Sequence, residues 1–315
     1  MNNYLEKQSI TNSSVPFNAC LVISGILLVL MLPVLAWLNH HEWSRDQYWN
    51  SQIDWFIAFN HYCSSHPELW LNLTQLGNAF ILLPLLSFFI IVRPAIWAAF
   101  FGAIPLGTLL THGGKALASI PRPAAVLDEN LIHVVGEQLT GHDSLPSGHT
   151  ATVFVAGTVI MLTLFFSNRH SSRWFILTGL LMTTLTLAAS RVAVGAHWPL
   201  DLFFGALCGY FGGLSGIFLT QRYSRWWIWI KQTEHQHIPG LILLFWSVSL
   251  LPSLYTQPPH PETVSWLAAI IGIATSGYLI IGHYTRAKLS FTQTYVSLQL
   301  TYPTLVVSWN ENRSQ

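Results

Sequence analysis

Three short polar segments carry most of the side chains in this sequence that could take part in chemistry. Each stands at the edge of a long apolar run. They are Lys115 with Arg122-Pro123, the run Leu145–Thr150, and Ser190-Arg191 with His197 and Asp201. Together they supply three cations, two imidazoles and a carboxylate. This set of groups can hold a phosphoryl group and transfer it.

The cations and the start of one apolar run are suited to binding phosphate. Arg122 and Arg191 each offer a planar fork that can grip two phosphate oxygens, and Lys115 adds a point charge. Ser147 and Gly148 stand where the next apolar run begins, and the free N–H groups at a helix start favour an anion. Glycine also lets the backbone approach the anion closely. We therefore expect these five residues to bind phosphate.

The two histidines and the aspartate are suited to catalysis. His197 and Asp201 are four residues apart at a predicted helix start, with Pro199 in the first turn. A carboxylate bonded to one ring nitrogen would leave the other free to attack phosphorus. His149 could then protonate the leaving oxygen.

Taken singly, these residues have ordinary explanations. An arginine at a membrane edge usually anchors the helix, and Ser-Gly-His usually begins one. A histidine and an aspartate four residues apart usually form a local hydrogen bond. The combination in a chain poor in charge favours one shared site.

Composition places the chain in the membrane. Only 9% of the residues are Asp, Glu, Lys or Arg, against roughly 25% in ordinary soluble domains. The apolar runs are long enough to cross a bilayer as helices, whereas barrel strands would be shorter and alternate. A net charge of +1 gives no indication of nucleic-acid binding, and three cysteines without metal-like spacing indicate neither a metal site nor a disulfide framework. We predict an all-α, polytopic integral membrane helix bundle.

Eight membrane spans are predicted. They are Phe17–Leu38, Leu69–Val92, Ile96–His112, His149–Phe166, Trp174–Ala189, Pro199–Thr220, Pro239–Tyr255 and Thr263–Gly282. The first has no cleavage pattern after it and is expected to be a retained helix. The aromatic-rich stretch Trp43–Tyr62 fits a helix in the headgroup layer, or alternatively a loop packed on the helix ends.

Charge between the spans predicts the orientation. With both termini in the cytoplasm, ten of the 14 Lys and Arg residues fall on the inner side. The three polar segments then share the outer face. Gly205, Gly209 and Gly213 recur every four residues, a spacing that lets helices pack closely. We expect this packing within the chain rather than in a dimer.

The three polar segments, in this order and spacing, resemble the signature of the type-2 phosphatidate phosphatase superfamily, of the bacterial membrane type. This family of lipid phosphate phosphatases shares its site with vanadium haloperoxidases. The resemblance implies that His197 is the nucleophile that forms a phosphohistidine, that Asp201 orients it and that His149 is the general acid. It implies that Lys115, Arg122, Ser147, Gly148 and Arg191 hold the phosphate, and that neither a metal nor another cofactor is required.

The resemblance also divides the chain. Residues 1–220 are expected to form a six-span lipid phosphatase core, residues 221–288 a cytoplasmic linker with two extra C-terminal spans, and residues 289–315 a cytoplasmic tail. The loop Ala124–Ser144 is expected either to line a lipid entrance or to be a solvated cover. His112 and His142 match no signature position and are left out of the predicted site.

The sequence thus predicts an enzyme that removes phosphate from a lipid at the outer, periplasmic face of a bacterial inner membrane. Its partners would be membrane lipids and a lipid phosphate substrate. The family implies undecaprenyl pyrophosphate, phosphatidylglycerophosphate or phosphatidate as substrates. Two alternatives remain open: a lipid phosphotransferase, for example to lipid A, and a non-catalytic phospholipid-binding transporter or scaffold.

Overall fold

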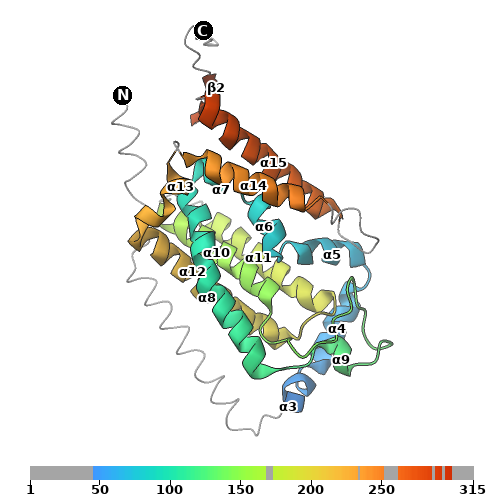
Figure 1. The fold of residues 1–315 in the computed structure, drawn as a ribbon. Coiled ribbons are helices and arrows are strands. Elements are labelled where there is room, and N and C mark those ends of the chain that lie inside the picture. Colours follow the sequence, from blue (N-terminus) through green and yellow to red (C-terminus); the bar gives the residue numbers. More distant parts are fainter. Residues whose placement is uncertain are drawn as a thin grey trace.

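The structure is a computed structural model that describes residues 45–167, 173–232, 235–251, 262–285, 288–292 and 295–299. Helices make up most of it (Figure 1). The described part is an all-α membrane bundle, as the composition predicts. The first predicted span, Phe17–Leu38, lies outside the described residues.

Four long helices form the centre of the molecule. They are α8 (Pro94–Ala118), α10 (Gly148–Ser167), α11 (Arg173–Ala193) and α12 (Pro199–Arg222). Helix α12 packs against both α8 and α10, and α11 packs on the other side of α10 (Figure 1). Among the described residues, four helices are long and apolar enough to cross a membrane. They are α8, α11, α12 and the C-terminal helix α15 (Glu262–Thr285).

Glycines explain why α12 lies so close to its neighbours. A Cβ atom on Gly209 would meet the carbonyl oxygen of Ala151 in α10. One on Gly216 would meet the backbone of Ala99 in α8. The packing surface predicted from the four-residue spacing is confirmed, and it lies within one chain.

The second predicted span is wrong as one continuous helix. Residues 67–92 form three short helices: α5 (Pro67–Gln75), α6 (Ala79–Leu85) and α7 (Phe89–Val92). The side chain of Asn78 caps α6 by accepting a 3.0 Å hydrogen bond from the N–H of Phe80. Gly77 precedes it, and a Cβ there would lie 2.8 Å from Cβ of His149. The break therefore lets the chain pack directly on the first turn of α10.

Short helices cover one end of the bundle. Helices α3 (Arg45–Asn50), α4 (Ile53–Cys63) and α9 (Pro123–Val126) lie there, next to the segment that leads into α10 (Figure 1). Tyr48 and Phe56 are buried in a cluster with Trp198 at the start of α12. Within the predicted stretch Trp43–Tyr62, the structure describes residues 45–62, which are mostly helical and pack on the end of the bundle.

The C-terminal helices form a second layer beside the bundle. Helix α14 (His237–Ser249) packs against α15, and α15 also contacts α6 (Figure 1). The short helices η1 (Ser224–Trp227) and α13 (Ile228–Lys231) connect α12 to this layer. Strands β1 (Lys288–Thr292) and β2 (Tyr295–Gln299) then pair as an antiparallel hairpin. The division of the chain near residue 220 stays a prediction.

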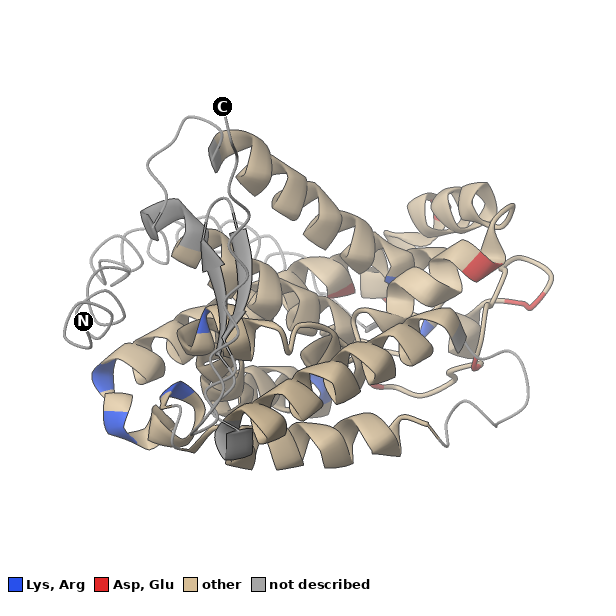
Figure 2. Cartoon of the chain, turned by 90° about the horizontal axis from the view of Figure 1, so that it is seen from above, with Lys and Arg blue, Asp and Glu red and all other residues tan. Residues whose placement is uncertain are grey.

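Charged residues gather at the two ends of the bundle. Figure 2 shows acidic residues at the end that carries α3 to α5 and the loop before α10, and several basic residues at the opposite end. The candidate membrane spans each contain an 18-residue window with at most two charged residues, as expected for helices that cross a bilayer. Which end faces the cytoplasm stays a prediction.

Candidate active site

The structure brings the three polar segments together at one end of the bundle. Lys115 lies in the last turn of α8 and Arg191 in the last turn of α11. Asp201 lies in the first turn of α12, and the N–H of Ser147 donates a 3.0 Å hydrogen bond to its carbonyl oxygen. The starts of α10 and α12 are therefore joined directly through the backbone.

His197 and Asp201 form a buried pair. Nδ1 of His197 lies 3.3 Å from Oδ2 of Asp201, and both side chains are almost fully buried. Nε2, the other ring nitrogen, lies 3.4 Å from Nη1 of Arg122. If Nδ1 carries the hydrogen and donates it to Asp201, Nε2 keeps a lone pair directed towards the cations.

Three further groups hold Asp201 in place. The hydroxyl of Tyr48 donates to Oδ1 at 2.7 Å, and that of Ser144 donates to Oδ2 at 2.5 Å. The N–H of Trp198 also donates to Oδ2, at 2.9 Å. Every one of these donors favours a charged carboxylate over a neutral one. Asp201 is therefore fixed in the orientation that it needs to bond His197.

Arg122 connects the histidine to an acid in the loop before α10. Its Nε and Nη2 donate to the two carboxylate oxygens of Asp143, at 2.8 and 3.2 Å. Its Nη1 donates to the carbonyl of Ala196 at 3.2 Å and faces Nε2 of His197. Lys115 lies 3.3 Å from the same carboxylate. Two of the predicted phosphate-binding cations thus share one aspartate.

Arg191 is as buried as Arg122 and is less completely bonded. Its Nη1 donates a 2.7 Å hydrogen bond to the hydroxyl of Thr74 in α5. Its Nε is buried and has no hydrogen-bond partner among the residues that the structure describes. A buried guanidinium with an unused N–H is costly unless an anion completes it.

The three residues at the start of α10, Ser147, Gly148 and His149, differ in what they contact. Oγ of Ser147 accepts hydrogen bonds from the N–H of Thr150 at 3.4 Å and from its hydroxyl at 3.0 Å, so Ser147 caps the helix. Gly148 has open space where a Cβ would be. His149 stands beside it, within electrostatic reach of Arg191 and His197. Their roles towards phosphate stay predictions.

Burial and charge act together on His197. Removal from water lowers the pKa of its imidazole well below the usual value of about 6.5, and the cations Arg191, Arg122 and Lys115 lower that pKa further. The ring is therefore neutral near pH 7. A neutral imidazole is the form that can act as a nucleophile.

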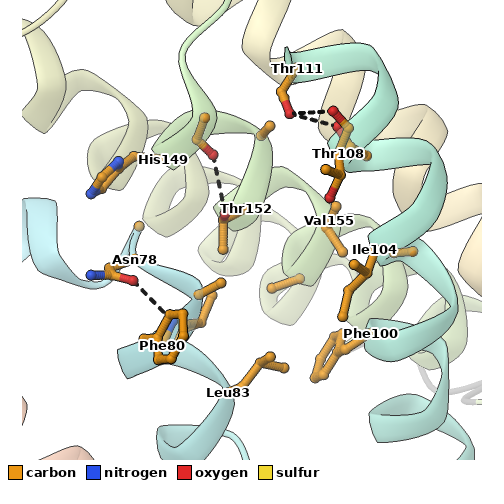
Figure 3. Close-up of a pocket in the computed structure, with 18 of the residues that line it drawn as sticks. Asn78, Phe80, Leu83, Phe100, Ile104, Thr108, Thr111, His149, Thr152 and Val155 are labelled. Atoms are coloured by element: carbon orange, nitrogen blue, oxygen red, sulfur yellow. Dashed lines mark hydrogen bonds between the residues drawn. The ribbon is translucent and has the colours of Figure 1, made fainter. Parts of the chain in front are cut away.

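An apolar cavity of about 420 Å³ adjoins the polar groups. Gly148 and His149 lie at its polar end, and its walls come from α6, α8 and α10 (Figure 3). Phe80, Leu83, Phe100 and Ile104 line it further along, and Trp246 of α14 contributes at the α6 side. The volume is within the range of roughly 300–1,000 Å³ that is usual for small-molecule sites.

Sequence reasoning missed Tyr48, Ser144 and Asp143 as members of this site. Ser144 and Asp143 stand just before the Pro-Ser-Gly-His run, so their position in the sequence could have indicated that they belong to the site. Tyr48 lies 153 residues from Asp201, and no local pattern links the two. Of the histidines left out, His112 lines the apolar cavity and His142 is exposed.

Comparison with known proteins gives consistent matches. Residues 95–227, which contain all three polar segments, match the model of the PAP2 superfamily. The chain is 24% identical to phosphatidylglycerophosphatase B of Haemophilus influenzae over 58% of its own length and 88% of that protein. It is 25% identical to undecaprenyl-diphosphatase of Sulfolobus acidocaldarius, over 58% and 84% of the two chains.

A solved structure is also similar in sequence. The crystal structure of Aquifex aeolicus LpxE is 30% identical and covers 53% of this chain and 94% of that chain, with a TM-score of 0.44. The family match spans every position of the signature from Lys115 to Asp201. The chain belongs to the PAP2 superfamily, the type-2 phosphatidate phosphatases.

Proposed function

We propose that this protein is a membrane lipid phosphatase that works through a phosphohistidine on His197. One observation carries the proposal. The buried imidazole of His197 has Asp201 on one ring nitrogen and the guanidinium of Arg122 beside the other. Mere binding of a phosphate group needs the cation, but it needs neither the neutral imidazole nor the carboxylate behind it. Membership of the PAP2 superfamily and the phosphatase names of the relatives support the same activity.

The reaction has two steps in this proposal. In the first, Nε2 of His197 forms a bond to phosphorus while the bond from phosphorus to the lipid oxygen breaks, and His149 gives that oxygen a proton. In the second, His149 takes a proton from water as the water oxygen attacks phosphorus. The N–P bond then breaks, and inorganic phosphate leaves with His197 restored. Asp201 stabilises the charged ring between the two steps.

Positive charge would stabilise the transferring group. Arg122 contacts Nε2 of His197, and the charges of Lys115 and Arg191 also act on this ring. Ser147 and Gly148 would add donors at the start of α10. Arg191 has a buried N–H available, which supports its role as a phosphate ligand. Fixed donors of this kind lower the barrier because they need not reorganise as charge develops.

The cavity supports a lipid as the substrate. It is lined mainly by apolar side chains and begins at His149, one of the proposed catalytic groups (Figure 3). A phosphate held by the cations would place an attached hydrocarbon chain in this cavity. Phosphatidylglycerophosphate, undecaprenyl pyrophosphate and phosphatidate all have this form. We propose that the site faces the outer side of a bacterial inner membrane, with both termini in the cytoplasm and no metal or other cofactor.

Release of phosphate from a short-chain phosphatidate tests the activity. Purified protein in detergent and chelator is expected to release inorganic phosphate, and acid-labile label is expected on His197 when the lipid phosphate is radioactive. His197→Ala is expected to abolish both signals. His66→Ala is a matched control, because His66 is exposed at the start of α5.

The outcomes separate the proposal from its alternatives. A phosphotransferase would release little phosphate until an acceptor lipid is added, although it would still form the labelled histidine. A transporter or scaffold would bind the lipid phosphate without releasing or trapping phosphate. Activity that persists in His197→Ala would exclude the mechanism, and activity that disappears in chelator would exclude its independence of metal.

A further inference from the structure

Asp143 occupies an unusual position for an acid in a phosphate site. Its two oxygens accept hydrogen bonds from Nε and Nη2 of Arg122, and one of them also accepts a bond from Lys115. A carboxylate held by an arginine fork and a lysine has the same arrangement of donors as a bound phosphate. Asp143 therefore contacts two of the three cations proposed to bind the substrate.

The two edges of one guanidinium connect Asp143 to the proposed nucleophile. The edge formed by Nε and Nη2 bonds Asp143, whereas Nη1 lies 3.4 Å from Nε2 of His197. An anion bound at Nε2 would thus share the guanidinium with the carboxylate. Because the two negative groups would lie on neighbouring edges, each would weaken the binding of the other.

Asp143 is charged and partly accessible to water. The hydrogen bond from Arg122 holds the pKa of this carboxyl well below its usual range, and the charges of Arg122 and Lys115 act in the same direction. Its side chain is 51% exposed, whereas that of Arg122 is 8% exposed. The carboxylate can therefore compete for the cation without being locked into the interior.

We propose that Asp143 is an internal competitor that lowers the affinity of the site for free phosphate. The proposal rests on the proposed function, in which inorganic phosphate is the product. A lipid phosphate is held by its hydrocarbon chain as well as its charge, so it tolerates the competition. The free phosphate ion has only its charge, so it is released. Asp143 would thus select for phosphate attached to a lipid and against the product.

A purely structural role makes the opposite prediction. If Asp143 serves to hold Arg122 in the correct orientation, its removal must weaken the binding of phosphate. Asn at this position keeps an oxygen that can accept from Nε of Arg122, but it lacks the negative charge. Asp143→Asn therefore separates the effect of charge from that of position.

Binding of inorganic phosphate to the purified full-length protein in detergent tests the proposal. The dissociation constant is measured by calorimetry and checked as a competitive inhibition constant against short-chain phosphatidate. Asp143→Asn is expected to bind phosphate about tenfold more tightly than the unchanged protein. Asp143→Glu keeps the charge and is expected to bind phosphate as weakly as the unchanged protein. Asp128→Asn is the matched control, because Asp128 is an exposed acid of the same loop bonded to Asn130.

Each result has a distinct meaning. Phosphate affinity in Asp143→Asn that is lower than in the unchanged protein, or that is equal to that of Asp128→Asn, overturns the competitor role and leaves the lipid phosphatase intact. Failure of the unchanged protein to release phosphate from lipid overturns the proposed function instead. Thermal unfolding of each variant shows whether it is folded. Asp143→Ala also lacks the negative charge and is expected to bind phosphate more tightly than the unchanged protein, so it keeps the test decisive if Asp143→Asn is unstable.

Discussion

The hydroxyl of Tyr48 donates a 2.7 Å hydrogen bond to Oδ1 of Asp201, across 153 residues of sequence. Burial raises the pKa of the Tyr48 phenol, and the neighbouring charge of Asp201 raises that pKa further. The phenol therefore keeps its hydrogen and acts as a donor. Through this contact, a short helix outside the family match positions the carboxylate behind the proposed nucleophile.

Removal of this hydroxyl is expected to slow catalysis. Tyr48→Phe deletes one of the donors to a buried carboxylate, and hydrogen bonds to charged groups contribute roughly 1.5–3 kcal/mol. We expect kcat to fall about tenfold or more, with little change in KM, because Tyr48 contacts Asp201, which is proposed to act on the substrate only through His197. Steady-state kinetics on short-chain phosphatidate measure both constants. Tyr62→Phe, at a site that is 81% exposed, should leave them unchanged. A change confined to KM would contradict the positioning role.

The pH dependence of stability follows from the lowered pKa of His197. Below about pH 6.5 the unfolded chain takes up a proton at this position, whereas the folded protein does not until a lower pH is reached. Stability contributed by neutral His197 is therefore present above that pH and is lost as the pH falls. As the pH falls from 7 to 5, we expect the Tm of the unchanged protein to fall relative to the Tm of His197→Gln.

Thermal unfolding in detergent at several pH values measures this shift. His66→Gln is the control for the substitution itself, because His66 is exposed at the start of α5. A difference in Tm between the unchanged protein and His197→Gln that does not change with pH would mean that burial and the cations do not disfavour protonation of His197.

Gly216 is expected to tolerate no side chain. A Cβ there would meet the carbonyl oxygen of Ala99 and lie 2.9 Å from the N atom of Ala103, and these backbone atoms of α8 cannot turn away. Gly216→Ala should lower the free energy of unfolding by roughly 1–3 kcal/mol or more. In Gly179→Ala the new methyl group meets no atom within 4 Å, so that variant should be neutral or stabilised by roughly 0.5–1 kcal/mol. Equal Tm values for the two variants would contradict the close contact between α12 and α8.

Trp246 is expected to influence which lipid chains are accepted. Its Nε1 donates a 3.0 Å hydrogen bond to the carbonyl of Phe80, and the centroids of the two rings are 5.4 Å apart. Both residues line the apolar cavity. Trp246→Ala should enlarge the cavity and raise kcat/KM for longer chains relative to shorter ones. A panel of phosphatidates of increasing chain length measures this ratio. Trp226→Ala, at an exposed position outside the cavity, is the control, and an unchanged ratio in Trp246→Ala would contradict the role.

The class of fold and the grouping of the polar segments could be predicted because both depend on local pattern. Apolar runs predicted α10, α11 and α12 within a few residues of their bounds. The span Leu69–Val92 could not be predicted correctly, because hydropathy does not register the cap at Asn78 or the contact of Gly77 with His149. The cap depends on a single polar residue, and the contact of Gly77 depends on a partner that is distant in sequence.

The same distinction applies to the site. Lys115, Arg122, His197 and Asp201 are recognisable from spacing. The supports of Asp201 are not, since Tyr48 reaches it only after α3 packs on the start of α12. Asp143 stands four residues before Ser147, yet its bonds to Arg122 and Lys115 depend on the fold of the intervening loop. Acids near a predicted cation site are therefore worth considering as part of that site.

The glycine contacts of α12 also determine where substrate preference can change. A Cβ on Gly205 would lie 2.5 Å from the carbonyl oxygen of Ser147, so the starts of α10 and α12 meet with no room for a methyl group. A residue larger than glycine at position 205 would therefore push apart the starts of α10 and α12, which carry the proposed catalytic residues His149 and Asp201. Substitutions meant to change which lipid chains are accepted should therefore be made in the cavity wall formed by α6 and α8, where the cavity leaves free volume.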